Sequence, residues 1–160
     1  FRSANASVRP ALKGAQVLSL GLDDYKDRAK GLPVSLPVPV VGGGTRVIDA
    51  MPWDLAQIPH APASSALAGI VVRHLTARGV ALYSHAEDQA PLRVLVGANM
   101  PAVMVELGFL SNAEDERALT SGEQADRIVE ALVATVTDVR NGIPVPPAAE
   151  TPAPSRGGRQ

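Results

Sequence analysis

The alternation of apolar and polar positions predicts strands and helices in turn along the chain. Short β-type runs predict buried strands at 15–20, 92–96 and 102–106. Apolar residues at helical spacing, with capping signals at their ends, predict helices from Ser64 or Ser65 to Arg78, from Ser111 to Leu119 and from Ser121 to Asn141. Apolar strands that alternate with helices favour an α/β fold with a mostly parallel sheet covered by helices on both faces.

Proline and glycine set two segments apart from these elements. Residues 31–64 hold six prolines and the run Gly42-Gly43-Gly44, which predicts an extended surface connection. Residues 142–160 hold five prolines and little apolar content, which predicts a disordered tail or a linker. The expected organisation is one domain over 1–141 followed by this tail.

Composition narrows the class of protein. A chain of 160 residues with 46% apolar and 19% charged residues has the size and composition of one globular domain. A net charge of -1 without a basic cluster argues against nucleic-acid binding. No uninterrupted apolar run approaches the roughly 20 residues that span a bilayer, so no membrane span is expected. The absence of cysteine excludes disulfides and thiolate metal sites.

Glu106 is the strongest candidate for a catalytic residue. It directly follows the apolar run 102–105, and Gly108 and Ser111 then predict a turn into a helix. A partly desolvated carboxylate at the end of a strand can act as a general base. The alternative is a structural carboxylate that caps a backbone group or pairs with an arginine.

The residues around Glu106 form a specific motif. Pro101, a buried strand, Glu106, Gly108, Phe109, Leu110, Ser111 and Asn112 stand in the order and spacing of a signature of zinc-dependent N-acetylmuramoyl-L-alanine amidases. The chain resembles this family over residues 1–141. The resemblance implies a peptidoglycan hydrolase that cleaves the amide between N-acetylmuramic acid and the L-alanine of the stem peptide. It assigns Glu106 to activation of the attacking water and protonation of the leaving amine.

The same resemblance implies that this chain is an N-terminally truncated amidase domain. The family binds one zinc ion through His, Glu and His, and no residues here match the motif that supplies the first two ligands. The third belongs to a His-Ala-Asn motif, with which Ser3-Ala4-Asn5 aligns, so that Ser3 replaces the histidine. We therefore expect zinc in the complete family domain but not in this chain. The family acts in the periplasm or outside the cell, and no signal peptide is expected within the chain.

Each remaining candidate residue can also be explained by a purely structural role. His60 is a groove residue or a capping imidazole, His74 is expected to be partly exposed in a helix, and His85 is expected in a loop. Their spacing predicts no separate zinc site. Trp53 is a sugar-stacking residue or a hydrophobic anchor. The acidic run Glu114-Asp115-Glu116 is expected to face water at a helix start.

Two functions remain open. The first is the family's amidase activity, with this chain inactive alone. The second is a non-catalytic peptidoglycan-binding or regulatory module, which the serine at position 3 favours and the retained Glu106 disfavours. The sequence assigns peptidoglycan as the partner, leaves the residues that bind it unassigned, and does not determine the oligomeric state.

Overall fold

The computed structural model describes residues 2–4, 12–25 and 27–142, so the predicted tail lies outside the described residues from 143 onward. Short 3-10 helices are labelled η. In chain order the elements are β1 (Arg2–Ala4), β2 (Ala15–Leu20), η1 (Asp23–Tyr25), β3 (Val34–Pro39), β4 (Thr45–Ala50), η2 (Trp53–Leu55), η3 (Ile58–His60), α1 (Ala61–Ala77), β5 (Leu82–Ala90), β6 (Met104–Phe109), α2 (Ala113–Leu119) and α3 (Gly122–Arg140). Strands and helices combine as the α/β prediction requires.

Four strands form one mixed sheet in the order β1–β6–β2–β5. β1 is parallel to β6 and β2 is parallel to β5, but β2 and β6 are antiparallel, with Gln16 opposite Glu106. The sheet is therefore mixed, and the prediction of a mostly parallel sheet is not confirmed. Apolar content reports how deeply a strand is buried, whereas its direction depends on the connections. Residues 91–103 connect β5 to β6 without a helix. β6 is antiparallel to β2, which itself is parallel to β5.

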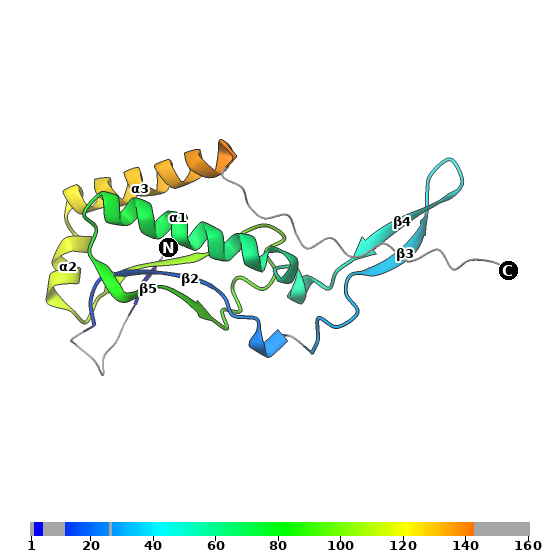
Figure 1. Ribbon diagram of the computed structural model, residues 1–160, viewed down its shortest axis with the longest axis horizontal. Helices are drawn as coiled ribbons and strands as arrows, with labels where there is room; N and C mark the ends of the chain where they lie inside the picture. The colour runs from blue at the N-terminus through cyan, green and yellow to red at the C-terminus, as the bar shows by residue number, and fades with distance from the viewer. Residues whose placement is uncertain (1, 5–11, 26, 143–160) are drawn as a thin grey trace.

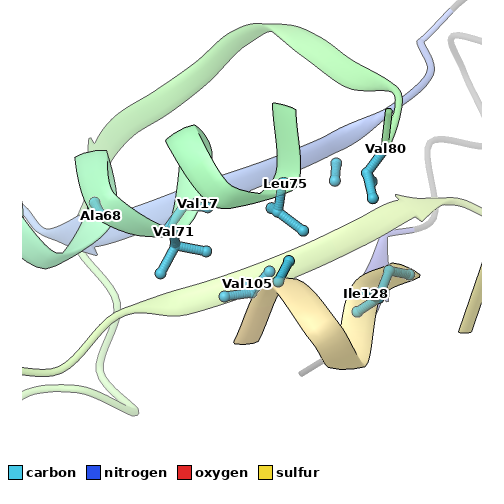
Figure 2. Packing of buried hydrophobic residues seen from close by; sticks show 9 residues of the cluster. Val17, Ala68, Val71, Leu75, Val80, Val105 and Ile128 are labelled. Atoms are coloured by element: carbon cyan, nitrogen blue, oxygen red, sulfur yellow. The ribbon is translucent and has the colours of Figure 1, made fainter. Parts of the chain in front are cut away.

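Both long helices lie on one face of this sheet instead of covering both faces (Figure 1). Figure 2 shows the core between the sheet and these helices, in which Val17 and Val105 meet Val71 and Leu75 of α1 and Ile128 of α3. Successive side chains of a strand point to opposite faces. Because Val17 and Val105 face the helices, Gln16 and Glu106 belong to the other face.

The helix ends follow the predicted signals at the C-terminal side better than at the N-terminal side. Gly79, with φ +69°, follows α1 and Gly142, with φ +88°, follows α3, as expected for helix-terminating glycines. Ser121 is the N-cap of α3 as predicted, but Asn112 replaces Ser111 as the N-cap of α2. α1 begins at Ala61, before the predicted serine caps.

Ser64 has a different use from the predicted cap. Its hydroxyl donates to the carbonyl of His60 (3.0 Å) and accepts from the backbone N–H of Ala102 (3.0 Å). The side chain is buried inside the first turns of α1. Ser64 therefore links α1 to the segment that leads into β6. As an N-cap, the same side chain would have stayed at the surface.

The segment predicted to be an extended connection contains a β-hairpin. β3 and β4 pair as an antiparallel two-stranded sheet, and Gly42, Gly43 and Gly44 turn the chain with φ between +93° and +99°. The hairpin projects from the body of the molecule (Figure 1). The prolines of β3 are tolerated because a strand in a two-stranded sheet has a free edge where no backbone donor is required.

Two other strand predictions need correction. Residues 92–96, predicted as a strand, are a turn whose Leu95 and Val96 pack beneath Leu20 at the end of β2. β5 was not expected, and it includes His85, which was predicted to lie in a loop. Its sequence is polar because most of its side chains are exposed at the edge of the sheet. By contrast, the strand predicted at 15–20 is confirmed as β2.

Among the residues that the structure describes, one segment, Trp53–Ala77, is long and apolar enough to cross a membrane by length and composition alone, with a mean hydropathy of 1.2. It comprises η2, η3 and α1. Ala68, Val71 and Leu75 within it are buried against the sheet. The packing of α1 in the core accounts for its apolar composition.

Candidate active site

Glu106 is a buried carboxylate in the middle of β6, with 3% of its surface exposed. Gln16 of the antiparallel neighbour β2 donates from Nε2 to its Oε2 at 2.5 Å. The prediction that Glu106 ends the strand is wrong, since β6 continues through Gly108 to Phe109. The side chain consequently lies over the sheet face opposite α1 and α3, where strand pairing fixes its position.

β1 places the backbone of Ser3, the predicted replacement of a zinc-ligand histidine, close to the backbone of Glu106. Arg2 is in register with Glu106, and Ala4 is in register with Phe109. The backbone of Ser3 therefore lies next to the catalytic candidate, between two registered pairs. The side chains of β1 and all of Asn5 lie outside the described residues, so the register concerns the backbone alone.

Asp115 shapes the turn that follows Glu106. Its Oδ2 accepts from the backbone N–H of Phe109 (2.8 Å) and of Gly14 (2.9 Å), which joins the end of β6 to the start of β2. A Cβ on Gly108 would lie 3.0–3.2 Å from the Asp115 side chain, and the φ of Gly108 is +155°. The glycine of the motif is therefore required by the approach of this carboxylate.

The expectation that the whole acidic run faces water is thus wrong for its middle member. Asp115 is buried, with 7% of its surface exposed, while Glu114 and Glu116 are exposed. Asn112 accepts at Oδ1 from the backbone N–H of Glu114 (2.9 Å) and Asp115 (3.3 Å) and so starts α2. A cap at Asn112 turns Asp115 inward, because it fixes where the first turn of the helix begins.

Replacing Asp115 by alanine is expected to destabilise the domain by about 2–4 kcal/mol, because two buried backbone N–H groups lose their acceptor. Urea unfolding of the variant and of the parent chain measures this difference. Glu116→Gln is the matched control, since that side chain is exposed in the same helix, and it is expected to change stability by less than about 0.5 kcal/mol. An unchanged midpoint for Asp115→Ala would show that these hydrogen bonds contribute nothing.

The three histidines lie apart from Glu106, each with another partner. His60 Nε2 lies 3.0 Å from Asn99 Oδ1, and His85 Nδ1 lies 3.2 Å from Ser84 Oγ. His74 Nε2 lies 2.7 Å from Asp138 Oδ2 across the α1–α3 contact, and this hydrogen bond lowers the pKa of Asp138. His74 is partly buried, close to the expected partial exposure.

Among the described side chains, no three His, Cys, Asp or Glu residues lie close enough together to hold a metal ion. The Glu106 carboxylate accepts a hydrogen bond from Gln16, whereas the hydrogen bonds of the described histidines go to other residues. A zinc site needs three or four ligands in a compact arrangement. The described residues therefore do not fit the metal that the amidase resemblance implies.

Sequence reasoning missed two residues that define this site. Gln16 is a polar residue inside an otherwise buried strand, and this interruption was the available signal. Asp115 gave no distinct signal, because three consecutive acidic residues at a helix start look equally exposed in sequence. Only the cap and the strand ends identify the one that turns inward.

The chain thus combines a mixed α/β fold, a buried glutamate in β6 and, directly after that strand, a helix capped by Asn112. The family model for N-acetylmuramoyl-L-alanine amidase matches residues 4–138, and the chain belongs to this family. A relative from Haemophilus influenzae, named "Probable N-acetylmuramoyl-L-alanine amidase AmiB", is 34% identical over 146 residues, which cover 82% of this chain and 33% of the relative.

Solved structures of amidases share the fold. The N-acetylmuramoyl-L-alanine amidase of Clostridium difficile 630 superposes with a TM-score of 0.58 at 15% identity, covering 89% of this chain and 56% of that one. AmiC2 of Nostoc punctiforme superposes with a TM-score of 0.56 at 16% identity, covering 87% and 54%. The chain thus spans about a third of its curated relative and just over half of these structures.

Proposed function

We propose that this chain is the part of a peptidoglycan amidase that carries the catalytic glutamate, Glu106. The single observation behind the proposal is a buried carboxylate held by Gln16 within the family's motif, on the sheet face that the long helices leave uncovered. The substrate is the amide between N-acetylmuramic acid and the L-alanine of the stem peptide. This hydrolysis takes place in the periplasm or outside the cell.

Glu106 would act as a general base and then as a general acid. Its carboxylate takes a proton from the attacking water and returns it to the nitrogen of the leaving L-alanine as the amide bond breaks. Gln16 restrains one carboxylate oxygen by its hydrogen bond. This restraint holds the base in one orientation, which lowers the entropic cost of reaching the reactive geometry.

The test is hydrolysis of purified peptidoglycan by a completed domain, made by joining the N-terminal part of the Haemophilus relative to this chain with Ser3→His. Amidase action releases stem peptides with a free amino group on L-alanine and leaves the glycan strands intact. New glycan ends without free L-alanine would instead indicate another bond, and would overturn the proposal.

The chain by itself is expected to retain no zinc at a fixed site and to release no stem peptides. The reason is the donor set, because a serine hydroxyl is a poor zinc ligand and the described residues offer no cluster of ligands. Metal analysis after dialysis against metal-free buffer measures the bound zinc. One tightly held zinc ion per chain would contradict this expectation.

A second function, binding of peptidoglycan without hydrolysis, is favoured by the serine that stands where the family has a histidine. Cosedimentation of the chain with insoluble peptidoglycan tests it. Binding by a completed domain that never releases stem peptides would favour this alternative over the amidase.

A further inference from the structure

A pocket outside the candidate active site is formed by three regions that are far apart in sequence. It has a volume of about 160 Å³ and is lined by residues of η1, the turn after it, η2 and the turn at 93–97, among them Tyr25, Arg28, Trp53, Asp54, Arg93 and Gly97. A neighbouring hollow, lined by Leu22, Tyr25, Ala29 and Ile58, shares Tyr25 with it. A polar pocket therefore borders an apolar one.

Trp53 forms a fixed wall of this pocket although 78% of its surface is exposed. The edge of its indole lies against Gly97, where an added Cβ would come within 2.7 Å of Cε2 and 2.9 Å of Nε1. Any larger residue at position 97 would displace the ring. An exposed aromatic ring that rests on a glycine backbone presents its free surface to a ligand at little entropic cost.

The charges in the pocket favour an anion. Arg28 forms an ion pair with Asp54, and this pair leaves no net charge. Within residues 12–25 and 27–142, Arg93 makes no hydrogen bond or ion pair through its side chain, and it is exposed. One uncompensated guanidinium therefore remains, in a chain whose overall net charge is -1.

We propose that this pocket binds a carboxylate of the peptidoglycan stem peptide, with Arg93 as the residue that recognises it. A planar guanidinium offers two parallel donors that match a carboxylate. Trp53 and Tyr25 pack against the peptide next to this carboxylate, and the apolar hollow takes a short side chain. The inference rests on the proposed function, because that function supplies the acidic peptide.

The chain carries its own reporter for the test, since Trp53 is its only tryptophan. The probe is the synthetic tripeptide L-Ala-γ-D-Glu-L-Lys with free carboxylates, added to the chain while tryptophan emission is recorded and calorimetry is run in parallel. We expect a saturable change in emission. The same tripeptide with both carboxylates converted to carboxamides is expected to bind at least about tenfold more weakly.

Two variants make the assignment specific. Arg93→Gln is expected to weaken binding of the free tripeptide at least about tenfold, while its urea midpoint stays unchanged because the side chain is exposed. Arg140→Gln removes the same charge from an exposed position at the end of α3 and is expected to leave binding unchanged.

Several results would overturn the proposal. They are the absence of both an emission change and a calorimetric signal, equal binding of the carboxamide peptide, or an unchanged affinity in Arg93→Gln. Stronger binding of a neutral disaccharide of N-acetylglucosamine would identify a sugar site instead. Hydrolysis by the completed domain is measured separately, so an active amidase without peptide binding here would refute only the pocket.

Discussion

Glu106→Gln in the completed domain is expected to slow amide hydrolysis by about 10²–10⁴-fold, the usual contribution of a general acid–base group. Glutamine has the size of glutamate, and its carbonyl oxygen can still accept the hydrogen bond that Gln16 donates. The fold is therefore expected to survive while the base is lost. The measurement is the initial rate of stem-peptide release at saturating peptidoglycan.

Two measurements on this variant, its metal content and its rate, distinguish the possible roles of Glu106. Metal content is expected to stay constant, and its loss would show that Glu106 is a metal ligand. An unchanged rate would show that the buried carboxylate is structural. Glu116→Gln, the same chemical change on an exposed side chain of α2, is the control and is expected to keep the full rate.

Gly14→Ala is expected to destabilise the domain by about 3 kcal/mol or more, the largest effect on stability of the changes considered. A Cβ at this position would lie 2.4 Å from the carbonyl carbon of Leu82 and 2.6 Å from the nitrogen of Tyr83. These are backbone atoms of β5, so no rotamer change can relieve the clash. The φ of +92° adds about 1–2 kcal/mol of backbone strain for a residue with a side chain.

Gly43→Ala is the matched control, because its φ of +98° is nearly the same and nothing lies within 4 Å of the added Cβ. It is expected to cost only the backbone term, about 1–2 kcal/mol. Urea unfolding of both variants against the parent chain gives the difference. Equal losses would show that the contact between Gly14 and β5 is not limiting.

The sequence alone determined the features that depend on neighbours along the chain. The apolar run at 15–20 is a buried strand, and the glycines after α1 and α3 end those helices. Glu106 lies in a strand as predicted, and the helix after the motif begins at Asn112, one residue from the predicted cap. Backbone conformation and capping are local properties, so a short stretch of sequence contains the information that specifies them.

The helical stripe on α3 shows where local pattern stops being sufficient. Ile128 is buried against the sheet, whereas Val129, Val133 and Val136 are 57–66% exposed. The periodicity identified an apolar face, but the crossing of α3 over α1 decides which half of it is covered. A helix buries only the strip that its neighbours reach.

Only the tertiary structure decided the direction of β6, the burial of Asp115 and the meeting of Tyr25, Trp53 and Arg93 in one pocket. Each depends on residues separated by tens of positions, which come together only after the strands pair. Strand order and direction follow from the connections and from which faces the helices cover, and no local pattern encodes them. The sequence therefore singled out Glu106 as the catalytic candidate, while strand pairing brought Gln16 within hydrogen-bond distance of it.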